Sequence, residues 1–587
     1  MQSKKMLSEK KMLSWKRLMY VILIVLGVSS VFIVYNINEE RAKNIRIQNS
    51  QYEARTFTDT RQIDEQDRPA VRLFGDPAKD LYRDIYQNTK LMFERLHFSV
   101  IEEDWLEPEQ VGTDELVVFC DDSVGSYTNL QELGGFVARG GRVILAAGLP
   151  EGNEDSYLWP LLGIREKSVR ENYNKLLFEE PLLPVQKDEM VYDGYNMSTW
   201  LQVDNGAKVY MRDAAKKVPL LYTTDYQDGK LCLINGTFLT DVRCLGLLTG
   251  AVGAVSEDFI YPVLGVKAVF LDDFPMITFI NDRVCMRMYG CSTESFVRDI
   301  VWPSFQGISL RTATPYTSGI LTVASSKESF PAINDSLFTA IGKSALQYDG
   351  ELIYIEKCLK EDQICFNTDF ITEFAEVFQN YDIRGMALQT EYFSEEMLDI
   401  PGAQIRIVRG QLGWEGNDIA CGGRYTGFPA ATTGNTMEDG NLFAVYSVLA
   451  SYGMISSVLA AYGMVSHVFD VNALIAEDEN TASWDQDKSQ LGVFEADILR
   501  RVGWLDGKTI SQTSDDVRSY LSLDYGWERD GERIELDCSG IVRGQAFLYR
   551  TDHRILEAQG LTYEEAGNGY YLLRVQENHA VIVTEGE

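Results

Sequence analysis

The fold of this chain is decided by the stretch Val266-Lys267-Ala268-Val269-Phe270-Leu271-Asp272-Asp273-Phe274-Pro275. Its apolar residues predict a buried strand that ends in two adjacent carboxylates and a proline. α/β enzymes place metal ligands and general bases at the carboxyl ends of such strands, because this edge is open to substrate and the strand holds the backbone rigid. Asp272 and Asp273 are therefore the first candidate site residues. The alternative is a structural turn in which their oxygens accept backbone N–H groups.

Outward from this stretch, residues 263–515 alternate short strands with helices. This alternation predicts a parallel sheet, as in a βα barrel. The expected strands cover 318–324, 351–356 and 405–409, and the expected helices cover 370–379 and 440–452.

Residues 69–262 precede this region and predict an α/β domain. Strand, helix, glycine pair and strand follow one another there, which is typical of a βαβ unit. Cys120 follows one of the strands, at the position of an amidotransferase nucleophile. No Gly-x-Cys-x-Gly elbow surrounds it, so we expect a buried structural thiol. The elements are a helix at 81–96, a strand at 115–120, a helix at 129–139, Gly140-Gly141 and a strand at 142–147.

The two ends of the chain have patterns of their own. A basic tail (1–17) precedes a run of eighteen uncharged residues, which at 1.5 Å per residue is long enough to cross a bilayer. We therefore expect a single transmembrane signal anchor at 18–36, with the basic end in the cytoplasm and the bulk of the chain outside it. Residues 37–68 are polar and predict a stalk. At the other end, alternating strands in 525–587 predict a small β-sandwich.

The composition narrows the classes of partner. A formal charge of −33 argues against nucleic acid, because the phosphates would be repelled. It suits a cationic partner, such as a polymer with free amino groups, or simply solubility. Nine scattered cysteines without a C-x-x-C pair, and only four histidines, offer few metal ligands.

A local repeat precedes one of the four histidines. The ten-residue units at 447–456 and 457–466 are nearly identical. Ten residues turn a helix by about 1000°, roughly 80° short of whole turns, so the two copies cannot present the same face of one helix. We predict that one copy is looped out or extends a helix end just before His467.

The order of the motifs resembles that of a known group. After Asp272-Asp273 come Gly423-Arg424-Tyr425-Thr426-Gly427 and Val465-Ser466-His467-Val468-Phe469, and then the expected β-sandwich. In this order they resemble the NodB-type polysaccharide deacetylases. The resemblance is closer to an uncharacterised bacterial family that is related to the deacetylase part of the Pel exopolysaccharide modification protein and is found in Gram-positive Pel gene clusters. It implies a flavodoxin-like or amidotransferase-like α/β domain, a NodB-like deformed (β/α) barrel and a C-terminal β-sandwich.

The resemblance also implies roles for single residues. Asp272 would be the general base, Asp273 a metal-binding carboxylate, Arg424 the arginine that orients the base, and His467 the general acid. A divalent metal such as zinc would polarise the acetamide carbonyl and activate water. The implied reaction is N-deacetylation of an N-acetylhexosamine polymer.

One part of the pattern departs from the group. Where the group has an H-x-x-x-H ligand pair, this chain has Ile355 and Leu359, and neither side chain can bind a metal. Glu356 and Cys358 are competent ligand types, but adjacent strand positions point to opposite faces.

Two functions therefore stay open: a deacetylase with a degenerate metal site, or a non-catalytic polysaccharide-binding or scaffold subunit of an exopolysaccharide export complex. The expected partners are extracellular polysaccharide, other exopolysaccharide synthesis proteins and the cell membrane. A third class, a glycoside hydrolase, would need two carboxylates facing each other across a groove.

Overall fold

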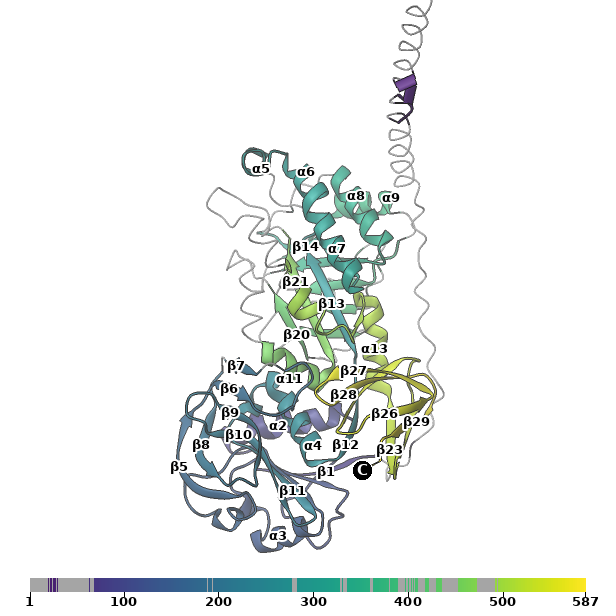
Figure 1. Cartoon of the computed structure of the whole chain (residues 1–587). Helices are drawn as coiled ribbons and strands as arrows, with labels where there is room; N and C mark the ends of the chain where they lie inside the picture. Colours follow the sequence, from purple (N-terminus) through teal and green to yellow (C-terminus); the bar gives the residue numbers. More distant parts are fainter. Residues whose placement is uncertain are drawn as a thin grey trace, which may run out of the picture.

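The computed structural model describes most of the chain from residue 68 onward (Figure 1). Of the first 67 residues it describes nine: Met19, Tyr20, Ile22, Leu23, Val25, Leu26, Gly27, Ser29 and Ile63. After residue 67, the residues outside the description are 187, 193, 277–281, 328–329, 331–334, 359–362, 379–380, 389–395, 397–399, 401–402, 404, 406, 410–416, 422–428, 435–451, 472–490, 493–494 and 587.

The predicted membrane anchor at 18–36 lies mainly outside the described residues. The same is true of the basic tail (1–17) and of nearly all of the stalk (37–68). The described residues between Met19 and Ser29 are helical. Within the described part of the chain, no helix combines the length and the apolar character needed to cross a membrane.

The front of the chain forms a nine-stranded sheet, which we call the front sheet. Val71 and Leu73 face a core shared with α2 (Asp80–Arg95) and α4 (Leu245–Val255), whereas Phe74 faces a second core under α3 (Leu130–Ala138). Both faces are thus buried, as expected of parallel strands. The first five strands in the order are parallel to one another. The order is β2 (Ser99–Glu102), β1 (Ala70–Phe74), β3 (Leu116–Phe119), β4 (Arg142–Leu145), β11 (Gly229–Ile234), β10 (Pro219–Tyr226), β9 (Lys208–Asp213), β6 (Lys175–Phe178) and β7 (Glu189–Val191).

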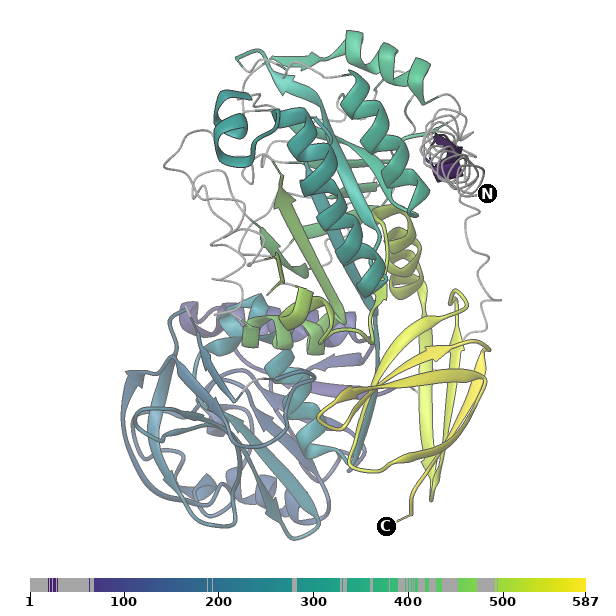
Figure 2. The same ribbon diagram turned by 45° about the horizontal axis from the view of Figure 1, so that its top comes forward.

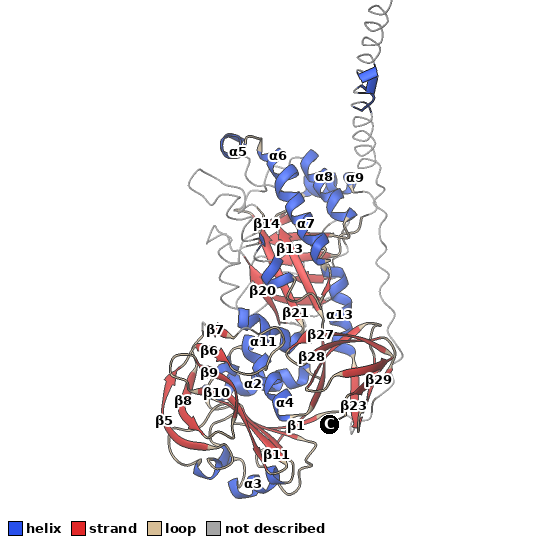
Figure 3. Cartoon of the chain, viewed as in Figure 1, coloured by secondary structure: helices blue, strands red, loops and turns tan. Residues whose placement is uncertain are grey.

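The middle of the chain forms a half-barrel sheet around the stretch that ends in the two carboxylates. β13 (Val266–Asp272) is buried along its whole length and pairs in parallel with β14 on one side and β21 on the other. Helices α7 (Trp302–Thr312), α8 (Asp335–Gln347) and α9 (Thr368–Val377) lie outside these strands (Figure 3). The other strands are β14 (Tyr316–Ser325), β15 (Glu351–Lys357), β16 (Ile364–Phe366), β17 (Gly385–Leu388), β18 (Ile407–Arg409), β19 (Asn417–Cys421), β20 (Pro429–Gly434), β21 (Met464–Asp470) and β22 (Asp506–Gly507).

The expected α/β class is confirmed, with differences at the edges of elements. The strands predicted at 318–324 and 351–356 are β14 and β15, and the helix predicted at 370–379 is α9. Within the strand predicted at 405–409, residues 407–409 form a strand, 405 is not part of it, and 406 lies outside the described residues. The helix predicted at 440–452 lies outside the described residues except for its last position.

The C-terminal part is β-rich and recruits one strand from far away in the sequence. β12 (Asp258–Val263) pairs with β25 along its whole length, so a strand from the end of the predicted front region joins a C-terminal sheet. Figure 2 shows these sheets beside the front sheet. One sheet has the order β12, β25 (Gln545–Thr551), β28 (Tyr570–Val575) and β27 (Leu561–Gly567); the other has β23 (Asp524–Asp530), β24 (Arg533–Ser539), β29 (His579–Thr584) and β26 (Ile555–Gln559).

The tandem repeat extends a helix. Residues 452–456 of the first copy and 457–462 of the second together form α11 (Tyr452–Tyr462), while 447–451 lie outside the described residues. This helix packs on α4 so closely that a Cβ added at Gly246 would lie 1.9 Å from the backbone oxygen of Ser457. The hydroxyl groups of Thr249 and Tyr261 donate to the Ala460 carbonyl at 3.2 Å and 2.7 Å. The second copy thus ties the front sheet to β21.

We expect Gly246→Ala to destabilise the protein, because the new methyl group would meet backbone that cannot move aside. The cost of such overpacking is about 1–3 kcal/mol. Gly134→Ala in α3 is the matched control, since its Cβ would have its nearest neighbour at 3.6 Å. Replacing a helical glycine that has free space around it by alanine stabilises a protein by about 0.5–1 kcal/mol. Urea unfolding gives the free energy of unfolding of both variants. An equal change in the two variants would contradict the close packing of α4 and α11.

Candidate functional site

The two carboxylates of the opening stretch stand at the carboxyl edge of the half-barrel sheet. Asp272 is the last residue of β13, and Asp273 follows with a φ of 52°, in the left-handed region. The Phe274 amide then donates to the Gly319 carbonyl of β14 at 3.0 Å. A left-handed aspartate costs backbone energy, and such outliers gather at functional sites. Both side chains are buried, at 3% and 5% exposed.

Asp272 is paired with an arginine from another strand. Its Oδ2 accepts from Nη2 of Arg409 at 2.5 Å, and Arg409 is only 1% exposed. The guanidinium also lies 4.4 Å from the ring centre of Phe270, two residues earlier on the same face of β13. Arg409 ends β18, which brings it to the same edge of the sheet. Sequence reasoning assigned the orienting role to Arg424, and that residue lies outside the described residues.

Asp273 is paired with a lysine. Its Oδ2 accepts from Nζ of Lys357 at 2.5 Å, where the lysine side chain is 20% exposed. Burial raises the pKa of Asp273 above its usual value, although the Lys357 ammonium opposes this shift. The other oxygen, Oδ1, is buried without a hydrogen-bond partner among the described residues. The sequence analysis did not single out Lys357.

The first predicted ligand position faces the site but carries an apolar side chain. A Cβ placed on Gly319 would lie 2.3 Å from Cδ1 of Ile355 and 3.4 Å from Oδ1 of Asp272, so both side chains meet over this glycine. Lys357 lies two residues beyond Ile355 on the same face of β15. Glu356 therefore belongs to the opposite face, where it is fully buried and accepts from the Cys358 amide at 2.9 Å. The second predicted ligand position, Leu359, lies outside the described residues.

His467 is not brought to the two carboxylates. In the parallel register of β13 and β21 it stands opposite Val269, three residues before the strand end and about 10 Å below Asp272. Val269 and Asp272 point to opposite faces, so the His467 side chain shares the face of Val269. Its ring packs edge-on against Phe469 at 4.1 Å between ring centres, and it is 0% exposed. Burial lowers the pKa of His467 to about 3.

These residues do not fit a divalent metal. A structural or catalytic zinc ion takes three or four nitrogen, sulfur or oxygen ligands. In the part of the chain that the structure describes, no three side chains of His, Cys, Asp or Glu gather in a way that could hold one. The carboxylate pair instead has one cation for each acid.

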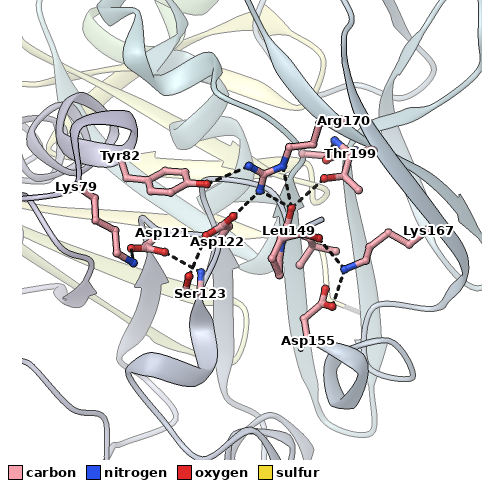
Figure 4. A network of polar contacts seen from close by, with 12 residues as sticks. Lys79, Tyr82, Asp121, Asp122, Ser123, Leu149, Asp155, Lys167, Arg170 and Thr199 are labelled. Atoms are coloured by element: carbon pink, nitrogen blue, oxygen red, sulfur yellow. Dashed lines mark hydrogen bonds and ion pairs between the residues drawn. The ribbon is translucent and has the colours of Figure 1, made fainter. Parts of the chain in front are cut away.

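The front sheet has a second polar cluster, at the carboxyl ends of β1 and β3 (Figure 4). The chain passes from β1 to β2 on one side and returns to β3 on the other, which makes this edge the switch point where open α/β sheets bind ligands. Here Lys79 pairs with Asp121 at 2.5 Å, and Arg170 pairs with Asp122 at 2.5 Å. Burial opposes ionisation of Asp122, but hydrogen bonds from Tyr82 and Arg170 hold its pKa below the usual value.

One further strand covers this cluster. Arg170 lies on β5 (Ile164–Asn172) and also donates to the Leu149 carbonyl at 2.6 Å. Lys167 of the same strand bonds Asp155 at 2.6 Å. Cys120, beside the cluster, is fully buried, and burial raises its pKa to about 12. The expected burial of this thiol is confirmed.

Comparison with known proteins gives one family and several distant structures. Residues 71–360 match the model of a family described as an uncharacterised protein conserved in bacteria (DUF2194). No curated protein matches the chain. A ThuA-like protein from Bacteroides uniformis is 12% identical, with 34% of this chain and 94% of that chain covered and a TM-score of 0.25.

Two sugar-cleaving enzymes are similar over a shorter share of their length. The exo-β-1,4-mannosidase Op5Man5 from Opitutaceae bacterium strain TAV5 is 15% identical, with 29% of this chain and 32% of that chain covered and a TM-score of 0.21. The β-galactosidase from Bacillus circulans sp. alkalophilus is 13% identical, with 33% of each chain covered and a TM-score of 0.22. This chain thus spans about a third of the length of both enzymes.

The buried His467 predicts a specific loss of stability in acid. Its pKa is near 6.5 when unfolded and about 3 when folded, so the unfolded state binds the extra proton between these values. Stability is therefore lost as the pH falls from about 6.5 toward 3, by about 2 kcal/mol at pH 5. Urea unfolding at pH 7 and pH 5 should show this loss in the wild type relative to His467→Leu. His553→Leu, which removes a half-buried histidine, is the control. An equal loss of unfolding free energy in the wild type and in His467→Leu would contradict a buried, neutral His467 ring.

Proposed function

We propose that this chain is a polysaccharide-deacetylase-like protein of exopolysaccharide metabolism whose half-barrel binds the polymer and does not hydrolyse it. One observation carries the proposal: both carboxylates at the end of β13 are paired with cations of the same chain, Asp272 with Arg409 and Asp273 with Lys357. A metal-dependent hydrolase needs a metal with an open position for water. Here Lys357 already binds Asp273, and the apolar Ile355 stands beside Asp272 where the resemblance implies a metal ligand.

The finer fold assignment belongs to the same proposal. The order β2, β1, β3, β4 in the front sheet supports a flavodoxin-like or amidotransferase-like domain. The carboxylates at the end of β13 support a NodB-like deformed barrel. Two four-stranded antiparallel sheets at the C-terminus support a β-sandwich.

A polymer with amino groups is the ligand that the charge of the chain favours. With 87 acidic against 54 basic residues, the surface attracts polycations. We propose an extracellular N-acetylhexosamine polymer that carries some free amines. The protein would be held at the outer face of the cell membrane by 18–36, with 37–68 as a spacer, beside other exopolysaccharide synthesis proteins.

Active N-deacetylation is the second candidate, and one observation favours it. Asp273 keeps a left-handed backbone and a buried Oδ1 without a hydrogen-bond partner among the described residues. Strain and an unsatisfied oxygen at one residue are what an acid with a chemical role would show. A metal would still have to displace Lys357 before Asp273 could bind it.

The test measures binding and turnover on the full chain in detergent. We expect retardation in gels that contain a partly deacetylated N-acetylhexosamine polymer, and none in gels with a neutral glucan, because the attraction is electrostatic. With zinc or cobalt added, acetate release should not exceed that of Asp272→Asn. The exposed Asp228→Asn is the matched control for loss of one carboxylate.

Two results would contradict the proposal. Metal-dependent acetate release that Asp272→Asn abolishes and Asp228→Asn leaves intact would establish the deacetylase. Failure to bind the acetylated and deacetylated polymers alike would remove the binding function. Circular dichroism of each variant separates loss of function from loss of fold.

A further inference from the structure

We infer that the ammonium group of Lys357 is the resident cation of the half-barrel site and takes the place of a divalent metal ion. The inference deepens the proposed function and rests on its non-catalytic half-barrel. It concerns which cation occupies the site, the Lys357 ammonium or a metal ion, and this can be measured without any substrate.

The strand order brings Lys357 to the carboxylates. β15 lies next to β14, and β14 lies next to β13, with all three parallel. Their carboxyl ends therefore meet at one edge of the sheet. Lys357 is the last residue of β15, and its Nζ reaches across β14 to Oδ2 of Asp273 at 2.5 Å. A cation at this point needs no loop to hold it, because three paired strands fix its position.

Two ion pairs stand at this edge, next to Asp470, which ends β21 in register with Asp272. Asp272 and Asp273 supply two negative charges, and Arg409 and Lys357 supply two positive charges, all within buried or largely buried side chains. Burial strengthens the interactions among these groups, since little water screens them. A divalent ion added to this set would leave an excess of positive charge, whereas removal of Lys357 would leave an unpaired carboxylate.

Among the side chains that the structure describes, none adds a third ligand to the pair. Ile355 lies against Asp272 over Gly319, in the position where the resemblance to the deacetylases implies a ligand. Glu356 and His467 belong to the other faces of their strands. Oδ1 of Asp273 is buried without a hydrogen-bond partner among the described residues, and a single carboxylate oxygen does not make a metal site.

The experiment compares zinc binding and thermal stability in four forms of the full chain. These are the wild type, Lys357→Met, Lys357→Arg and the control Lys175→Met, whose lysine is exposed on the front sheet. Each is dialysed against zinc, its metal content is measured by mass spectrometry, and its melting temperature is measured with zinc and with EDTA.

We expect the wild type, Lys357→Arg and Lys175→Met to retain well under one equivalent of zinc and to melt at the same temperature in zinc and EDTA. Lys357→Met should melt lower than Lys175→Met in zinc and in EDTA alike, because Asp273 loses its counter-charge and a metal gains no further ligands. A wild type that retains about one equivalent of zinc and is destabilised by EDTA would overturn the inference. This wild-type result decides the matter even if Lys357→Met does not fold.

The outcome is separate from that of the proposed function. A metal-free wild type that fails to bind polymer would remove the binding function and leave Lys357 as the resident cation. A wild type that binds polymer and also holds zinc would remove the inference and leave the binding function.

Discussion

A carboxylate that is buried away from water needs a counter-charge, and at the end of β13 two carboxylates are buried side by side. Arg409 and Lys357 supply the partners, each from the end of a different strand. Removing one member of a buried pair costs about 3–5 kcal/mol, because the other charge is left without compensation. The order of β13, β14, β15 and β18 in the sheet is therefore tied to these four side chains, and so is the chemistry available at this edge.

The front sheet meets the same constraint in the same way. At its switch point Lys79 and Arg170 neutralise Asp121 and Asp122, and β5 closes over them (Figure 4). In both sheets the edge that α/β proteins leave open for ligands is thus occupied by ion pairs of the chain itself.

The sequence predicted those features of the fold that depend on residues close together in the chain. The apolar run of β13 and the βαβ unit of the front sheet can be read from local patterns, whereas a missing ligand at Ile355 follows only from the resemblance to the deacetylases. The partners of the carboxylates could not be predicted, since Arg409 is 137 residues from Asp272 and Lys357 is 84 residues from Asp273. Strand order determines these contacts. One signal was present: Lys357 lies two positions after Ile355, on the same face of a predicted strand.

Zinc-edge anomalous diffraction from crystals of the full chain grown with zinc tests the central claim most directly. The account predicts no anomalous peak within about 2 Å of an oxygen of Asp272 or Asp273, and electron density for the Lys357 side chain beside Asp273. A peak that bridges the two carboxylates, with Lys357 turned away from Asp273, would contradict it.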